Sequence, residues 1–132
     1  MPNYTALVTL LAIALYFYTG LLVAKARAKF GVQAPATTGH PDFERVFRVQ
    51  MNTLEWMPIF LPLLWLFAFY VRDWGAAVLG LLWLVGRVHY ICGYMQAADK
   101  RYRGFAVQTM ASGALLIGAL IGIVWRMVHG GW

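Results

Sequence analysis

The chain has 132 residues, of which 61% are hydrophobic and only 12% are charged, and its formal net charge is +6 at pH 7. Soluble domains carry about 25% charged residues, so the composition excludes an ordinary water-soluble globular domain. The single cysteine excludes an intrachain disulfide and a cysteine-based zinc site, and we expect no bound metal; the basic residues lie beside apolar segments, where anionic lipid headgroups suit them better than nucleic acid does.

Four long apolar segments predict an all-α, integral membrane four-helix bundle that forms a single transmembrane domain over residues 1–132. The first helix is expected at about residues 4–29, and its apolar stretch of roughly 20 residues is long enough to cross a bilayer. No Lys or Arg precedes this stretch, so we expect a retained span rather than a cleaved signal peptide.

The second helix is expected at about residues 42–71 and is long for a membrane span. At 1.5 Å per residue it extends roughly 45 Å, against a hydrocarbon core about 30 Å thick, so its first half must protrude from the bilayer or line a cavity. Pro58 and Pro62 lie one turn apart in its apolar half and predict a bend. The connection that follows is very short, which predicts an antiparallel hairpin with the next helix.

The third helix is expected at about residues 74–101 and the fourth at about residues 105–128. An uncharged run from Phe105 to Trp125 makes the fourth helix long enough to span the membrane. Within it, Gly118 and Gly122 form a pair of small residues four positions apart, which would let another helix approach closely.

The distribution of basic residues predicts the orientation in the membrane. Cytoplasmic loops carry an excess of Lys and Arg, so the first and third loops are expected to face the cytoplasm and both termini the opposite side. The bases beside these two loops are Lys25, Arg27, Lys29, Arg45, Arg48, Lys100, Arg101 and Arg103, whereas only Arg72 and Arg126 lie near the other end.

A polar stripe follows one face of the second helix. Arg45, Arg48, Asn52 and Glu55 are spaced by three, four and three residues, which confines them to a sector of roughly 80°. Glu55 lies at or inside the membrane boundary, where an unpaired charge costs about 2.5–3.5 kcal/mol or more. It therefore needs a cationic partner, and either Arg48 or Arg87 is available.

The third helix repeats the pattern with Arg87, Tyr90 and Tyr94, and with Arg101 on the same face if the helix continues. Two helices joined by a tight turn would present these stripes to each other at one depth. One interpretation is that the polar groups only satisfy one another and bind nothing. The alternative is a binding site, because the arginines outnumber the single carboxylate and such a surplus suits an anionic ligand with carboxylates, such as a small acidic peptide.

Two runs of residues resemble the motifs of a known family. The first is FERVFRVQMNTLEWMP at residues 43–58, and the second is RVHYICGY at residues 87–94, followed by Arg101. They resemble the MAPEG superfamily, the membrane-associated proteins of eicosanoid and glutathione metabolism. The resemblance is nearest to its branch of microsomal glutathione transferases of types 2 and 3 and leukotriene C4 synthase, and it covers almost the whole chain.

The resemblance implies a homotrimer with a glutathione site at each subunit interface. Arg101 matches the catalytic arginine that stabilises the glutathione thiolate. The residues that match those holding glutathione are Arg48, Asn52, Glu55, Tyr90 and Tyr94, with Arg27 and Gln50 contributing from the interface. Trp56 departs from the pattern, because it replaces a tyrosine whose phenol would contact glutathione.

The implied function is that of a membrane-bound glutathione transferase that conjugates glutathione to hydrophobic electrophiles and also reduces lipid hydroperoxides. A thiol with a pKa near 8.5 is only a few per cent ionised at pH 7, and lowering this pKa by about two units requires about 2.7 kcal/mol of thiolate stabilisation, which one partly desolvated arginine can supply. The alternative is a non-catalytic lipid-binding or scaffold protein of the same fold. A small drug transporter is disfavoured, because the first helix has no carboxylate to hold cations.

The remaining reactive side chains are assigned structural roles. Cys92 is expected to be a buried small hydrophobic residue rather than a nucleophile, since no activating group adjoins it in the sequence. His89 lies beside the polar stripe of the third helix and is expected to be a packing or interfacial residue. Neither residue is predicted to take part in catalysis.

Overall fold

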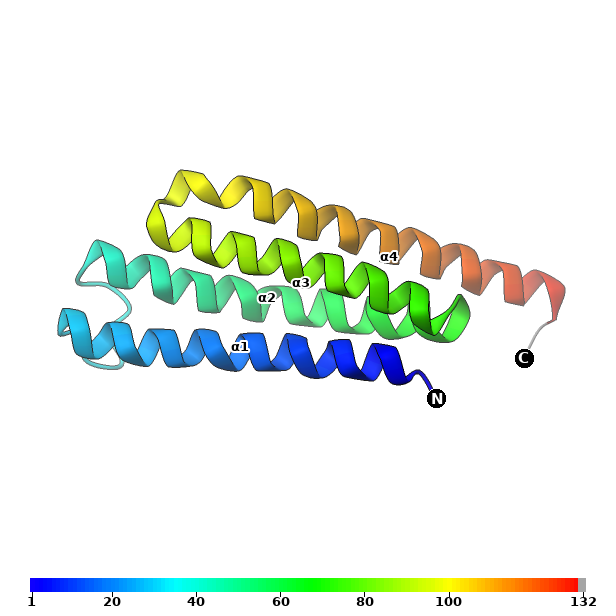
Figure 1. The fold of residues 1–132 in the computed structure, drawn as a ribbon, viewed down its shortest axis with the longest axis horizontal. Helices are drawn as coiled ribbons and strands as arrows, with labels where there is room; N and C mark the ends of the chain where they lie inside the picture. Colours follow the sequence, from blue (N-terminus) through cyan, green and yellow to red (C-terminus); the bar gives the residue numbers. More distant parts are fainter. Residues whose placement is uncertain (131–132) are drawn as a thin grey trace.

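The computed structural model describes residues 1–130 and contains four long helices that lie side by side (Figure 1). The helices are α1 (Asn3–Phe30), α2 (Pro41–Tyr70), α3 (Asp73–Gln96) and α4 (Tyr102–His129), and a short 3-10 helix, η1 (Ala98–Arg101), joins α3 to α4. Among the described residues no strand is present. Each long helix is apolar and long enough to cross a membrane, which confirms the predicted all-α, membrane-spanning four-helix fold.

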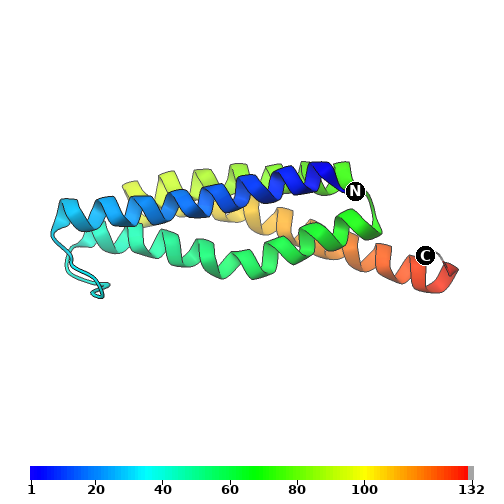
Figure 2. The same ribbon diagram turned by 90° about the horizontal axis from the view of Figure 1, so that it is seen from below.

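Successive helices run in opposite directions, so the connections fall at two ends of the bundle (Figures 1 and 2). The first connection, residues 31–40, and η1 lie at one end, which we call the loop end. The N-terminus, the turn between α2 and α3, and the end of α4 lie at the other, which we call the terminal end. At the terminal end α4 extends beyond its neighbours (Figure 1).

The end of α3 differs from the sequence prediction. The helix was expected to continue to Arg101, but it ends at Gln96, and Ala97 adopts an extended conformation with φ −160° and ψ 143°. The chain then folds back onto α3, since a Cβ placed on Gly93 would lie 2.4 Å from the carbonyl oxygen of Lys100. Arg101 therefore belongs to η1, and its position is set by this reversal rather than by the helical period of α3.

Glycines also bring α4 close to α2 and α3. A Cβ on Gly104 would lie 2.2 Å from the backbone nitrogen of Tyr90, so the two backbones touch where α4 begins. Further along α4, a Cβ on Gly118 would lie 2.3 Å from the ring of Phe67 on α2. A Cβ on Gly122 would meet backbone atoms at the end of the same helix. The predicted close approach at Gly118 and Gly122 is thus confirmed, and α2 is the partner.

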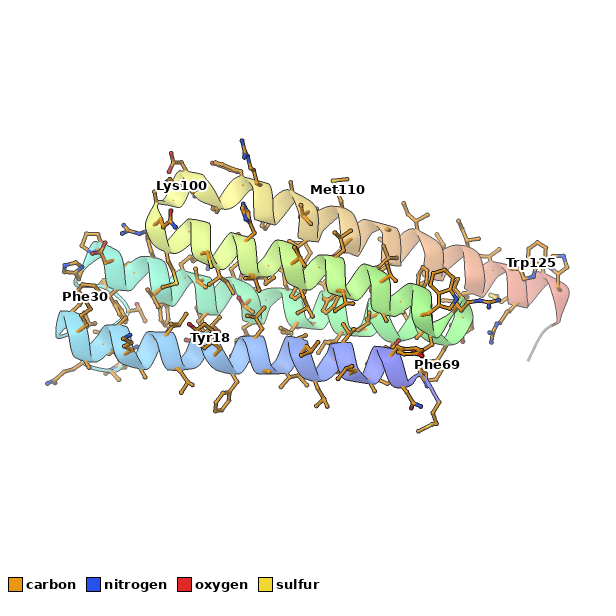
Figure 3. The ribbon with its side chains drawn as sticks, viewed as in Figure 1. Tyr18, Phe30, Phe69, Lys100, Met110 and Trp125 are labelled. Carbon is orange, nitrogen blue, oxygen red and sulfur yellow. The ribbon has the colours of Figure 1, made fainter. Side chains whose placement is uncertain are left out.

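The core between the helices is aromatic and aliphatic. Phe60 of α2 and Trp83 of α3 stack with their ring centroids 4.0 Å apart, and both side chains are fully buried beside Leu64 and Leu115. Many large apolar side chains instead point outward, among them Tyr18 and Met110 (Figure 3). An apolar outer surface on a packed bundle is what a lipid environment requires.

Asp73, the first residue of α3, fixes the terminal end. Its carboxylate accepts hydrogen bonds from the backbone N–H groups of Tyr4 and Thr5 at 3.1 and 2.9 Å, and from the Thr5 hydroxyl at 2.7 Å. A carboxylate at the positive, N-terminal end of a helix dipole stabilises the first turn of that helix, so Asp73 of α3 caps the N-terminus of α1. The bend in α2 near Pro58 and Pro62 is visible in Figure 2 and leads the chain toward this end.

Candidate functional site

A cavity of about 380 Å³ opens at the loop end, between α2, the last turns of α3 and the start of α4. This volume falls within the roughly 300–1,000 Å³ that is usual for small-ligand sites. We call it the Arg48–Arg101 cavity. Its walls are formed by Arg48, Asn52, Tyr90, Tyr94, Arg101, Tyr102 and Phe105.

The residues that the sequence predicts for the site fall into three groups in this structure: those that line the cavity, one that is joined to its wall, and two that lie apart from it. Arg48, Asn52, Tyr90, Tyr94 and Arg101 line the cavity together. Glu55 lies outside its wall but is joined to it through Arg48.

Arg27 and Gln50 lie apart from the cavity within one chain. Arg27 donates to the carbonyl oxygen of Ala36 in the first connection at 2.7 Å, and Gln50 lies against Gly20 of α1. The part assigned to them in a site shared between subunits stays a prediction.

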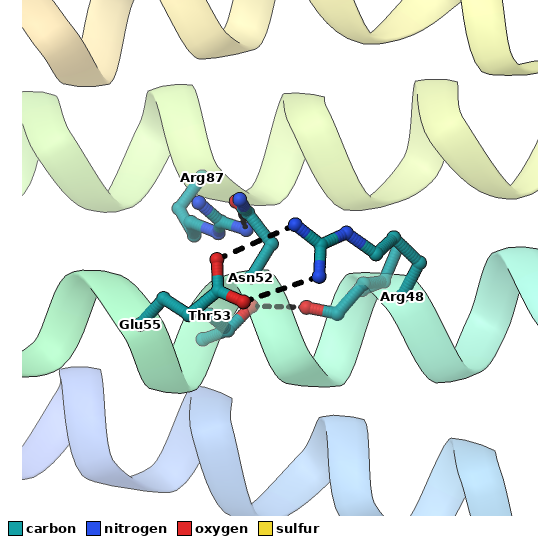
Figure 4. A network of polar contacts seen from close by, with 6 residues as sticks. Arg48, Asn52, Thr53, Glu55 and Arg87 are labelled. Atoms are coloured by element: carbon teal, nitrogen blue, oxygen red, sulfur yellow. Dashed lines mark hydrogen bonds and ion pairs between the residues drawn. The ribbon is translucent and has the colours of Figure 1, made fainter. Parts of the chain in front are cut away.

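Arg48 and Glu55 form an ion pair along the surface of α2 (Figure 4). The two guanidinium nitrogens donate to the two carboxylate oxygens at 3.1 and 3.4 Å, across two helical turns. Of the two cationic partners that the sequence offered for Glu55, the structure selects Arg48. Both side chains are about half exposed, at 53% and 54%, so a ligand can reach and rearrange this pair.

Arg101 is held over the cavity by contacts with η1 and with aromatic rings. Its Nη1 donates to the carbonyl oxygen of Ala98 at 2.6 Å, and its Nη2 donates to the Tyr102 hydroxyl at 3.3 Å. The guanidinium carbon lies 5.5 Å from the centre of the Tyr94 ring. A guanidinium has five N–H donors, so these two hydrogen bonds leave others for a bound anion.

Arg87 occupies a separate cluster behind the cavity wall. Its place on the polar stripe of the third helix predicts an arginine that faces a ligand, but its side chain is fully buried. Its Nη1 donates to Gln108 and its Nη2 donates to Asn52, both at 2.6 Å. Figure 4 shows Arg87 beside Asn52. The guanidinium carbon also lies 4.1 Å from the centre of the Tyr90 ring. Because the two amide oxygens occupy its terminal nitrogens, Arg87 orients Asn52 rather than binding a ligand itself.

Arg45 is also excluded from the cavity, although it lies on the predicted stripe of α2. Its guanidinium forms an ion pair with Asp42, one turn earlier in the same helix. A carboxylate at this spacing is within reach on a helix surface and draws the side chain toward the start of α2. The cationic groups at the cavity are thus Arg48 and Arg101, fewer than the sequence suggested.

Three residues of α4 take part in these two sites and were not predicted. Tyr102 and Phe105 line the cavity, and Gln108 binds Arg87. They are spaced by three residues, which places them on one face of α4, and this spacing is the signal that could have identified them. Trp56 packs edge-to-face on Phe105 with ring centroids 5.7 Å apart, so it supports that part of the cavity wall.

Cys92 does not have the environment that the sequence suggested. It was expected to be buried, but it is exposed on α3, on the side away from Tyr90. Two positions along a helix correspond to about 200°, so a residue two places from a core-facing tyrosine points outward. Within residues 1–130, no group of three or more His, Cys, Asp or Glu side chains comes together as a metal site would require.

Comparison with known proteins places this chain in a family context. A family model described as the MAPEG family matches residues 5–121. An uncharacterised protein of Synechocystis sp. is 54% identical over 122 residues, which cover 92% of this chain and 89% of the relative. Human microsomal glutathione S-transferase 2 is 44% identical over 116 residues, covering 87% of this chain and 79% of the relative. Bovine leukotriene C4 synthase is 38% identical over 119 residues, covering 90% and 79%.

Proposed function

The chain belongs to the MAPEG family and is an integral, multi-pass membrane protein, and from this premise we propose that it is a glutathione transferase whose site is the Arg48–Arg101 cavity. The observation that carries the proposal is the meeting of two arginines, an amide and three phenols in one accessible cavity of suitable size. The names of two relatives, a glutathione S-transferase and leukotriene C4 synthase, agree with glutathione-dependent chemistry.

The charge of the cavity suits glutathione. Arg48 and Arg101 are cationic and Glu55 is anionic, which leaves one positive charge in excess. Glutathione carries two carboxylates and one ammonium group at neutral pH, so its net charge is the opposite. Arg48 is placed to bind a carboxylate by charge-assisted hydrogen bonds, and Glu55 would accept from the ammonium group. Asn52, which Arg87 holds in place, offers its amide N–H donors to the peptide.

Arg101 is proposed to stabilise the thiolate. Ionising the thiol raises the negative charge of the ligand, and a guanidinium beside the sulfur favours that form. The sulfur then attacks an electrophilic carbon of a hydrophobic substrate from the bilayer. A carbon–sulfur bond forms, the leaving group departs with its electron pair, and the thiol proton is released to solvent. Reduction of a lipid hydroperoxide by the same thiolate is part of the proposal: the sulfur attacks the outer peroxide oxygen, the O–O bond breaks, and the lipid alkoxide takes a proton to become the alcohol. The thiol of a second glutathione then displaces water from the resulting sulfenic acid and forms glutathione disulfide.

The proposal includes an assembly and an orientation. We propose a homotrimer in which Arg27 and Gln50 reach the cavity of a neighbouring subunit, since within one chain both lie on the α1–α2 side of the bundle. The loop end carries most of the basic residues and is proposed to face the cytoplasm, with both termini on the opposite side.

The experiment that tests this function is an assay of the purified full chain with glutathione and an aryl halide, and in parallel with a lipid hydroperoxide. Arg101→Gln is expected to lower kcat/KM by about a hundredfold, the effect of losing roughly 2.7 kcal/mol of thiolate stabilisation. Lys29→Gln is the matched control, because it removes an exposed base at the same end that does not line the cavity.

Binding of glutathione without turnover of either substrate would contradict the enzymatic proposal. It would favour a non-catalytic lipid-binding or scaffold protein of the same fold. Equal activity of Arg101→Gln and Lys29→Gln would remove Arg101 from the mechanism while leaving the transferase assignment in place.

A further inference from the structure

A second polar pocket, of about 500 Å³, lies where α3, η1 and α4 meet, and it is separate from the Arg48–Arg101 cavity. Lys100 and Arg103 supply its cationic side chains, and His89 and Gln96 supply further polar groups. Lys100 lies on the side of the bundle away from α1 (Figure 3). Tyr102 is the one residue that lines both this pocket and the cavity.

An apolar groove of about 460 Å³ continues from this pocket along the outer face of α3. The two hollows share His89 and Cys92, so they form one continuous surface. Leu84 is nearly buried in the groove, whereas Val85 and Val88 remain 65% and 47% exposed. We call the polar pocket and the groove together the outer α3 site.

The dimensions of the outer α3 site match one leaflet of a membrane. The groove extends along α3 from Leu81 to Cys92, about 16 Å at a rise of 1.5 Å per residue. This is about half of the roughly 30 Å hydrocarbon core. The polar pocket lies at the loop end, where the chain leaves the membrane, so a molecule with a polar head at the surface and one chain directed inward fits both parts.

The charge of the polar pocket selects an anionic head. Lys100 and Arg103 take part in no ion pair within the described part of the chain, residues 1–130. Asp99 also lines the pocket, so one positive charge remains in excess. Among residues 1–130, the one side-chain hydrogen bond that Lys100 donates is long, 3.4 Å, and goes to Gln96. A phosphodiester with a single negative charge would neutralise the excess charge. Its oxygens would accept hydrogen bonds from the N–H groups of Lys100 and Arg103.

We propose that the outer α3 site binds an anionic phospholipid of the surrounding bilayer, with its phosphate at Lys100 and Arg103 and an acyl chain in the groove. A free phosphate would leave the groove unfilled, and a second copy of the chain would bring its own basic loop end against these bases. Because the site shares only Tyr102 with the Arg48–Arg101 cavity, the proposal stands apart from the transferase assignment.

Cys92 provides a direct probe of the outer α3 site. It is the single cysteine of the chain, it is exposed, and it lines both halves of the site. The experiment measures the rate at which N-ethylmaleimide alkylates Cys92 in the full chain, in phosphatidylcholine nanodiscs with and without phosphatidylglycerol. Phosphatidylglycerol is expected to slow alkylation several-fold, because the bound acyl chain and glycerol phosphate cover the thiol.

The double variant K100Q/R103Q is expected to weaken lipid binding about thirtyfold, on the basis of roughly 1 kcal/mol for each base near an anionic surface, so that the protection is lost. The matched control, K25Q/K29Q, removes two bases at the same end that lie outside the outer α3 site and should keep the protection. Thermal unfolding of both variants checks that they fold.

Three results would overturn the proposal. Equal loss of protection in the two double variants would mean that only the general surface charge acts. Equal protection by inorganic phosphate in phosphatidylcholine discs would assign the pocket to a free anion. Complete resistance of Cys92 to alkylation at every lipid composition would mean that another copy of the chain covers the groove.

Discussion

Two arginine regions lie next to each other in this bundle and share Asn52 and Tyr90, yet their surroundings differ. Arg87 is fully buried, and its terminal nitrogens are taken up by two amide oxygens. Arg48 is half exposed beside an open cavity, and Arg101 is partly exposed across it. The contrast teaches that a buried guanidinium whose terminal nitrogens are hydrogen-bonded within the bundle organises the structure, whereas an accessible one with free terminal donors is available to a ligand.

The largest expected effect concerns the buried region. Arg87→Met preserves an unbranched side chain but leaves the amides of Asn52 and Gln108 without their cationic donor. A buried polar group that loses its partner costs roughly 1–3 kcal/mol, and Gln108 is fully buried while Asn52 is partly buried, so the free energy of unfolding should fall by about 3 kcal/mol. Equilibrium unfolding in mixed micelles measures this.

Arg48→Met is the control for the buried arginine, because an exposed ion pair contributes only about 0–1 kcal/mol to stability. If the two variants were equally stable, the division between a structural and a ligand-binding arginine would be wrong.

An effect of intermediate size, on glutathione affinity, is expected at the Arg48–Arg101 cavity. Arg48→Gln removes the charge-assisted hydrogen bonds proposed for a glutathione carboxylate, and about 2 kcal/mol, or roughly thirtyfold in Kd, should be lost. Isothermal titration of glutathione into the detergent-solubilised protein measures the affinity. Arg45→Gln serves as the matched control, since that arginine pairs with Asp42 outside the cavity and its loss should leave the Kd unchanged. Equal losses in both variants would point to surface charge rather than to a specific contact.

The smallest expected effect concerns the cavity wall. Trp56 packs on Phe105, and the resemblance of its motif to the MAPEG family implies a tyrosine at this position. Trp56→Tyr should restore a phenol hydrogen bond to glutathione, worth about 1 kcal/mol, or about fivefold in affinity. The same titration measures it, with Trp56→Phe as the control that lacks the hydroxyl. A tyrosine variant no tighter than the phenylalanine variant would show that the phenol does not reach the ligand.

Helical periodicity was sufficient to predict much of the cavity. Spacings of four residues separate Arg48 from Asn52 on α2 and Tyr90 from Tyr94 on α3. In a continuous helix, residues at this spacing lie on the same face. The structure brings these four side chains to one cavity. The same reasoning predicted the four spans, because apolar length alone determines which segments can cross a bilayer.

The prediction failed where a helix stops or where a third element intervenes. Arg101 reaches the cavity through the chain reversal over Gly93, which depends on a backbone contact that no period encodes. Arg87 is buried because Gln108 arrives from α4, and the spacing within α3 carries no information about that partner. Arg45 pairs with Asp42 instead of lining the cavity, because a carboxylate one turn away on the same helix is closer than the cavity is.

The most direct test of the central claim is the ultraviolet difference spectrum of glutathione bound to the protein near neutral pH. If Arg101 stabilises the thiolate in the Arg48–Arg101 cavity, saturating glutathione should produce thiolate absorbance in the unmodified protein. The same absorbance should be absent from Arg101→Gln loaded to the same occupancy. Thiolate absorbance of equal size in both proteins, or its absence from the unmodified protein at full occupancy, would contradict the account.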